Sequence, residues 1–406
     1  MSESVSGTVV PGQGFEGLYP LARLILGHVC LHASMASMRL AAPLFALKQG
    51  QSALAVGALL ALFALTQVFL SIPAGRYADR HGLRRTIGWA VVVASLGATL
   101  PVALPGMATL CIAALCLGGA TGVSSIALQR HVGRMARDTT ELKRAFSLLS
   151  IGPALSNFLG PVAAGLLIDY ASAPLGGSAG DAIGFRAAFL LCALLPLATW
   201  LWIRHAPELP ASPHPVGSTR DHVMQVLGAA PMRRLLLVNW LLSSCWDVHT
   251  FVVPVLGHER DFSASVIGTI LGAFAVAAVG VRLVLPALAE RLREWVVITG
   301  AMLCTGVLFA IYPFMLSPWT MGLCSVLLGV ALGTVQPMVM STLHQITPDH
   351  LHGQAIAVRL MAINLSSVFM PMLFGSAGAL VGVSVVFWTV GALVGAGSHV
   401  AWRLRP

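Results

Sequence analysis

Charged residues are so unevenly spaced in this 406-residue chain that long stretches contain none. A transmembrane helix needs about 20 apolar residues, so the distance between successive charges indicates how many spans a stretch can hold. Stretches long enough for one span are 49–75, 145–168 and 187–203, and stretches long enough for two are 86–129, 295–348 and 360–402. Further apolar segments lie at about 21–47, 235–256 and 265–289. The sequence therefore predicts twelve transmembrane helices.

Composition supports an all-α polytopic membrane protein over a water-soluble helical bundle. Hydrophobic residues make up 57% of the chain and charged residues only 10%, whereas soluble domains carry about 25% charged residues. A soluble bundle would alternate charged and apolar faces, and these stretches do not. Within the double stretches, turns are expected at Pro101 to Gly106, at Pro313 to Pro318 and near Gly378 to Gly382.

The basic residues predict the orientation of the spans. Lys and Arg total 24 against 15 Asp and Glu, a balance that could indicate nucleic-acid binding. Most of them, however, fall in alternate loops, and only Lys48, Arg186 and Arg260 fall on the opposite side. By the positive-inside rule, both termini are expected in the cytoplasm, and the protein is expected in the inner membrane. The basic residues are thus explained by topology, and we expect no nucleic-acid partner. Residues 1–19 contain no Lys or Arg, so no removable signal peptide is expected.

An internal repeat divides the chain into halves. A constant shift of 211 residues superposes Pro43 on Pro254, Gly57 on Gly268 and Arg80 on Arg291. Such repeats are typical of transporters whose site lies between the halves. We predict an N-terminal tail at 1–20, a six-helix bundle at 21–204, a proline-rich linker at 205–231 and a second six-helix bundle at 232–403.

The loop after the second span carries the sequence Gly75-Arg-Tyr-Ala-Asp79-Arg80-His-Gly82-Leu-Arg84-Arg85. It resembles the signature loop of the major facilitator superfamily, written roughly G-x-L-A-D-R-x-G-R-R. The resemblance implies a twelve-helix transporter in which this loop holds the cytoplasmic ends of the halves together in one conformation. The alternative is a basic cluster that only stops membrane insertion. The matching loop of the second half, Pro286 to Arg293, lacks both glycines.

The fifth span contains Gly160-Pro161 and Gly165, similar to the G-P-x-x-G-G motif of antiporters and drug exporters in that superfamily. These residues, with Pro371 and Gly375 at the repeat-related positions, are also expected to bend their helices, because proline removes a backbone hydrogen bond. A generic kinked helix explains them equally well. Ala114 stands where the exporters' fourth-span arginine would be, and the first span has no buried acid. Both departures weigh against drug–proton antiport.

Polar residues form a stripe along the first and seventh spans. His28, His32 and Arg39 fall at about 0°, 40° and 20° on a helical wheel, so they share one face. Their repeat-related positions are Asn239, Ser243 and Thr250. Because ionisable groups at membrane depth are costly, we expect this stripe to bind substrate, with hydrogen bonding between helices as the alternative.

Asp247 is the only carboxylate inside a predicted span, and His249 follows it. Asp247 is expected to titrate as the proton-coupling group, with Arg39 as its partner. A purely structural bridge between the two is the alternative. Gln336 and Asn364 are further candidates for substrate binding, whereas Arg282 and Arg359 lie nearer helix ends, where their side chains can reach the membrane surface.

These features predict a secondary active transporter for a small organic solute, coupled to protons or another ion. Arg39, Arg282 and Arg359 outnumber the one acid within the spans, which favours an anionic or zwitterionic solute. A proton-driven multidrug or metabolite exporter and a non-transporting receptor or sensor are the alternatives. No nucleotide-binding loop or catalytic constellation is present, so we expect no enzyme activity, cofactor or metal, and a monomer whose partners are solute, coupling ion and lipid bilayer.

Overall fold

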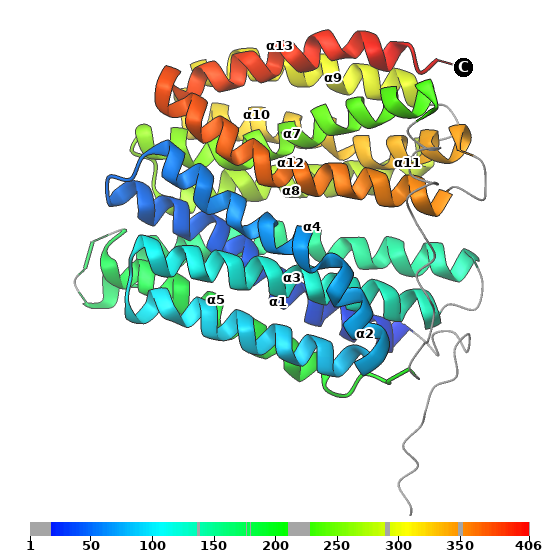
Figure 1. The fold of residues 1–406 in the computed structure, drawn as a ribbon. Coiled ribbons are helices and arrows are strands. Elements are labelled where there is room, and N and C mark those ends of the chain that lie inside the picture. Colours follow the sequence, from blue (N-terminus) through cyan, green and yellow to red (C-terminus); the bar gives the residue numbers. More distant parts are fainter. Residues whose placement is uncertain are drawn as a thin grey trace, which may run out of the picture. The chain divides into compact units, whose positions relative to one another are not determined.

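The computed structural model describes residues 18–135, 139–175, 177–178, 180–209, 228–288, 293–347 and 352–405. In these residues the fold is all-helical, with twelve helical segments long and apolar enough to cross a membrane. The prediction of twelve spans is confirmed. Long helices run side by side within each half of the chain (Figure 1).

The helices of the first half begin with α1 (Leu18–Lys48), which forms the first span. Two spans are joined in the single element α2 (Ala53–Ala103), which is followed by α3 (Met107–Met135) and α4 (Thr139–Tyr170). A short 3₁₀ turn, η1 (Ala173–Leu175), precedes α5 (Ala182–Ile203). Asp181 caps α5 by accepting a hydrogen bond from the Gly184 amide at 2.8 Å, so the helix start is fixed locally.

The second half contains α7 (Ala230–Glu259), α8 (Ala264–Leu288) and α9 (Glu294–Ile311), which continues into the 3₁₀ turn η3 (Tyr312–Phe314). The tenth span is divided between α10 (Pro318–Gly333) and α11 (Val335–Ile346). It is followed by α12 (His352–Val381) and α13 (Val383–Trp402). Gly382, with φ of 87°, separates the last two helices. The turns predicted between these spans are therefore observed.

Two compact units make up the chain: Met1–Ala41 with Leu62–Pro215, and Ala42–Ala61 with Val216–Pro406. The second unit thus includes the end of α1 and the start of α2. The predicted bundle and linker boundaries remain predictions, and most of the linker lies outside the described residues.

Serine and arginine side chains satisfy backbone carbonyls that prolines leave free. Pro196 cannot donate to the carbonyl of Cys192, which instead accepts a hydrogen bond from Ser34 at 2.5 Å. Pro337 likewise leaves the carbonyl of Gly333 free, and the Arg282 Nε donates to it at 3.1 Å. These contacts fasten α1 to α5 and α8 to the α10–α11 junction.

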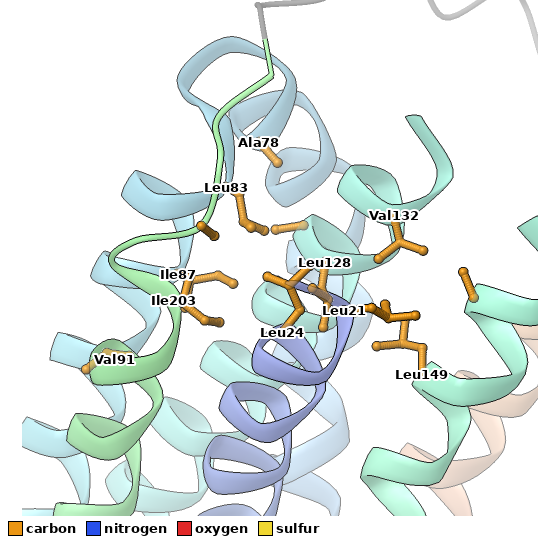
Figure 2. Packing of buried hydrophobic residues seen from close by; sticks show 13 residues of the cluster. Leu21, Leu24, Ala78, Leu83, Ile87, Val91, Leu128, Val132, Leu149 and Ile203 are labelled. Carbon is orange, nitrogen blue, oxygen red and sulfur yellow. The ribbon is translucent and has the colours of Figure 1, made fainter. Parts of the chain in front are cut away.

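A buried cluster of apolar side chains joins the helices at one end of the first unit (Figure 2). Leu24 of α1, Leu83 and Ile87 of α2, Leu128 of α3 and Ile203 of α5 meet there with exposures of 3% or less. Buried apolar side chains pack closely, so this cluster holds the part of α2 that follows Gly82 against α1, α3 and α5.

Candidate functional site

Gly82 marks the point where α2 changes direction. Its φ of 78° and ψ of −179° are outside the helical region and are adopted almost only by glycine. The sequence predicts a loop from Gly75 to Arg85, but α2 continues through most of that stretch and breaks at this one residue. The second glycine of the motif therefore has a conformational reason.

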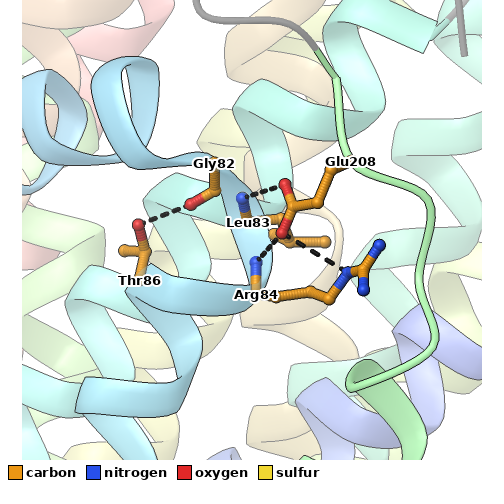
Figure 3. A network of polar contacts seen from close by, with 5 residues as sticks. All are labelled: Gly82, Leu83, Arg84, Thr86 and Glu208. Carbon is orange, nitrogen blue, oxygen red and sulfur yellow. Dashed lines mark hydrogen bonds and ion pairs between the residues drawn. The ribbon is translucent and has the colours of Figure 1, made fainter. Parts of the chain in front are cut away.

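The carboxylate of Glu208 occupies the space beside Gly82 (Figure 3). It accepts hydrogen bonds from the amides of Leu83 at 2.8 Å and Arg84 at 2.6 Å. The Arg84 Nε lies 3.6 Å from the same carboxylate. These amides begin the second part of α2, where the helix dipole favours a negative charge. A Cβ at position 82 would collide with the Glu208 carboxylate, which gives Gly82 a second, steric reason.

Three more residues of the signature loop, Gly75, Arg80 and Arg85, have described surroundings. Gly75 faces the guanidinium of Arg130 on α3, so a side chain there would displace that arginine. Arg80 and Arg85 are exposed and line an open pocket beside Glu208. The Asp79 side chain lies outside the described part of the structure. Sequence reasoning missed Glu208, although it is the first acid after the sixth span in a basic segment.

Replacing Gly82 by alanine is expected to lower the free energy of unfolding by about 1–3 kcal/mol, because alanine disfavours this backbone conformation. The Cβ also displaces the Glu208 carboxylate, which adds to this loss. Gly50→Ala is the control, since Gly50 has φ of 76° but open space around it. Thermal unfolding of both variants measures the difference. Equal losses would show that the contact with Glu208 contributes nothing.

His28 and His32 lie together on α1, as predicted, with ring centroids 5.8 Å apart. His28 is 3% exposed and packs beside Gly152 of α4. The Nδ1 atoms of both rings are buried and have no hydrogen-bond partner in the described structure. Arg39 is half-buried in the same unit. The face predicted from the helical wheel therefore contains two buried rings with unused polar atoms.

A polar seam runs between α7 and α12 in the second unit. Arg359 Nε donates to Asn239 Oδ1 at 3.1 Å, and the hydroxyl groups of Ser244 and Ser366 are 3.1 Å apart. One turn farther, the Ser367 hydroxyl lies 3.3 and 3.4 Å from the two Asp247 carboxylate oxygens. From the sequence, Asn239 and Asp247 are expected in the site, whereas Arg359 is expected near a helix end and Ser366 and Ser367 are not singled out, because they follow no repeat-related stripe.

His249 points into the interior of the second unit. It is fully buried, stacks on Phe274 with centroids 4.2 Å apart, and its Nε2 lies 2.9 Å from the Ser325 hydroxyl. Ser325 in turn contacts the Tyr312 hydroxyl at 2.8 Å. His249 and Asp247 thus have separate partners. Arg39 belongs to the other unit, so its predicted pairing with Asp247 remains a prediction.

The remaining candidates have weaker structural support. Thr250 donates to backbone carbonyls of its own helix at 3.1 Å, and Ser243 and Asn364 are half-buried. Gln336 is exposed near the α10–α11 junction. None of them joins the polar seam through a hydrogen bond between described residues.

The expectation that Arg359 extends to the membrane surface is wrong, because this side chain is 5% exposed and its Nε donates to Asn239. Arg282 is half-buried, and its Nε donates to the Gly333 carbonyl. Each of the two side chains thus finds an acceptor on a neighbouring helix.

Glycines allow backbone contacts near the predicted bending residues. Gly160 of α4 packs on the backbone of α1 near Ala33, and Gly375 of α12 packs on Ala53 and Gly57 of α2. Helices α4 and α12 continue through Pro161 and Pro371. Small residues of this kind let helices approach closely in membranes.

The family model described as Major Facilitator Superfamily matches residues 24–358 and 235–406. The multidrug resistance protein MdtG of Dickeya zeae is 25% identical over 362 residues, which cover 84% of this chain and 83% of that protein. MdtG of Enterobacter lignolyticus is 25% identical over 364 residues, covering 82% and 79%.

Solved structures of transporters share the fold. A POT family transporter in complex with 5-aminolevulinic acid has a TM-score of 0.78 at 14% identity, covering 98% of this chain and 99% of that one. An inward-facing, unoccupied bacterial homolog of the human lysosomal transporter Spinster has a TM-score of 0.78 at 13% identity, covering 96% and 98%. A D-xylose–proton symporter has a TM-score of 0.75 at 14% identity, covering 95% and 97%.

Proposed function

The chain belongs to the major facilitator superfamily, and from that premise we propose that it moves a small organic solute across the cytoplasmic membrane by proton-coupled alternating access. In this proposal the bundles at 21–204 and 232–403 move against each other, the linker at 205–231 joins them, and both termini are cytoplasmic. The protein is a multi-pass membrane transporter and not an enzyme.

The observation that carries the coupling is the position of Asp247. Asp247 is 6% exposed within the seventh span, and its carboxylate lies next to the hydroxyl of Ser367. An acid at this depth is costly when charged, so its proton affinity depends strongly on nearby charges. A solute that changes those charges changes proton binding, and by linkage the proton changes solute binding.

The charges of the polar side chains favour an anionic or zwitterionic solute. Arg39 and Arg359 place positive charge within the spans, and Arg282 donates to a backbone carbonyl. If an anion draws Arg39 away from Asp247, the acid takes up a proton with the solute, which is symport. If the solute is a cation, it competes with the proton at Asp247, which is exchange.

Multidrug export is the second candidate. The names of the MdtG relatives and the Gly160-Pro161 motif support it, and the missing acid of the first span opposes it. A receptor that kept the fold without transporting is the third reading, and it predicts no exchange of solute across the membrane.

Transport by purified protein in proteoliposomes tests the proposal. Benzenesulfonate, a permanent anion, and ethidium, a cation, are supplied with and without a pH gradient of either direction. We expect the gradient to drive accumulation of the anion, and a protonophore to abolish it. Gradient-driven movement of both probes would favour the multidrug reading, and movement of neither would contradict the proposal.

Arg39 is expected to supply positive charge for the solute. Arg39→Gln should lose binding of benzenesulfonate, whereas Arg39→Lys should keep part of it, because the charge remains and the two-pronged hydrogen bonding is lost. Equilibrium binding to the purified variants measures this. Normal binding by Arg39→Gln with altered thermal stability would show that the residue is structural.

A further inference from the structure

We propose that Arg359 and Asn239 form an anion-binding subsite in the second unit, which accepts the carboxylate or sulfonate group of an organic solute. The inference rests on the proposed transport function and names the part of the protein that selects the solute. Arg359 lies outside the polar stripe that the helical wheel predicts, whereas Asn239 belongs to it.

The two side chains form a buried group with more donors than acceptors. Arg359 is 5% exposed and Asn239 is 1% exposed. A guanidinium offers five N–H donors and no acceptor, and an amide offers two donors and one acceptor oxygen. That oxygen is already used by the Arg359 Nε at 3.1 Å, and the Asn239 Nδ2 is buried with no hydrogen-bond partner among the described residues.

Buried polar groups without partners are costly and therefore rare. The Asn239 amide holds its oxygen toward arginine, so its nitrogen presents donors beside the guanidinium. Around these atoms only an acceptor can complete the hydrogen bonding. Water satisfies the donors but not the charge, whereas an anion satisfies both.

The charge of Arg359 also favours an anionic ligand. Among the residues described for the second unit, no carboxylate lies within ion-pair distance of Arg359. Asp247 lies farther along α7, beside Ser367. A positive charge at this depth is stabilised by a counter-ion, and the solute is the component of the system that can provide one.

Arg282 provides the contrast within the same unit. Its Nε donates to the Gly333 carbonyl, which needs a donor because Pro337 cannot supply one. Arg282 thus completes the hydrogen bonding of the backbone at Gly333, which is a structural role. Arg359 donates to a side chain that itself brings surplus donors, so its surroundings suit a ligand.

The chemistry of the donors defines the ligand class. The planar guanidinium matches two oxygens of a carboxylate, sulfonate or phosphonate, and the adjacent amide can donate to one of them. A cation would be repelled. A neutral isostere of equal size would fill the same space without the charge, so it separates this subsite from general apolar binding.

Thermal unfolding of the full chain in detergent tests the subsite, with benzenesulfonate and its neutral isostere benzenesulfonamide as probes at equal ionic strength. We expect benzenesulfonate to raise the wild-type midpoint by roughly 2–4 °C more than the sulfonamide does at saturating concentration. Arg359→Gln should lose this difference. Arg282→Gln is the matched control and should keep the difference, because Arg282 bonds the backbone and not the solute. Each variant's response to the sulfonate is compared with its own response to the sulfonamide, so a general loss of stability does not affect the result.

Asn239→Asp is the variant that keeps the arginine paired. It places a carboxylate beside Arg359, so the fold is maintained and the added anion is excluded. We expect no difference between the two probes for this variant. An equal response of the wild-type protein to both probes would overturn the proposal, as would an undiminished sulfonate response in Asn239→Asp and Arg359→Gln.

Failure here is distinguishable from failure of the transport proposal. The unfolding assay uses no membrane and no gradient, so it reports the subsite alone. Proton-driven accumulation without sulfonate-specific stabilisation would keep transport and remove the subsite. Sulfonate-specific stabilisation without accumulation would keep the subsite and remove coupled transport.

Discussion

Asp247→Asn is expected to abolish gradient-driven accumulation of solute while leaving counterflow of solute intact. Counterflow exchanges solute on the two sides and needs no proton step, so it survives loss of the titrating group. Accumulation requires the proton, which asparagine cannot bind. Uptake of labelled benzenesulfonate into proteoliposomes, with an imposed pH gradient or with preloaded solute, measures the two activities separately.

Asp261→Asn is the matched control for this change. Asp261 is exposed between α7 and α8 and has φ of 55°, a conformation that asparagine also adopts readily. It should retain both activities. Full accumulation by Asp247→Asn would remove this residue from the coupling step, and His32 and His249 would become the next candidates because histidine is the side chain whose unperturbed pKa lies nearest to neutral pH.

Leucine at Gly57 is expected to reduce transport by about tenfold or more. A Cβ on Gly57 would collide with the Pro371 carbonyl oxygen, a backbone atom that cannot move aside without shifting α12. Helices α2 and α12 are therefore forced apart at this contact. A change of about 1.4 kcal/mol between two conformations already alters their ratio tenfold.

Cysteine labelling checks the direction of that change. A cysteine at position 53, next to Gly375, should react faster with a membrane-impermeant maleimide in Gly57→Leu than in the parent protein. Gly300→Leu is the control, because Gly300 lies in α9 with open space around it. Unchanged labelling and transport in Gly57→Leu would show that this backbone contact takes no part in the conformational cycle.

The spans could be predicted from the sequence because a membrane span is defined by local properties, namely the length, hydrophobicity and lack of charge of one segment. The stretch 86–129 contains no charged residue, and its turn falls between α2 and α3 as expected. The division of the tenth span at Thr334 is harder to predict from the sequence. It depends on Pro337 and on the arginine that bonds the freed carbonyl, and Arg282 is distant in sequence.

The candidate site was predicted in part, and the reason lies in which partners the sequence can reveal. A helical wheel places Asn239 and Asp247 on or near one face of α7, but it does not show which residues of another helix meet them. Arg359, Ser366 and Ser367 approach α7 only because α12 packs against it in a fixed register. Glu208 likewise meets Gly82 through the fold, across more than a hundred residues of sequence.

The glycines illustrate the same limit. Gly82 belongs to the loop predicted from the sequence, and its positive φ shows why glycine stands at that position. The close approach of Gly57 to α12 was visible only as a repeat-related match with Gly268. A pattern can mark a position as constrained, whereas the neighbour that constrains it comes from packing.

Proton movement driven by solute is the most direct test of the central claim. Wild-type protein is reconstituted into proteoliposomes that contain a pH-sensitive dye, and benzenesulfonate is added outside without any imposed pH gradient. Coupled transport predicts a change of internal pH that depends on the solute, saturates with its concentration and is absent from Asp247→Asn. Movement of labelled benzenesulfonate with no accompanying pH change in the wild-type protein would contradict it.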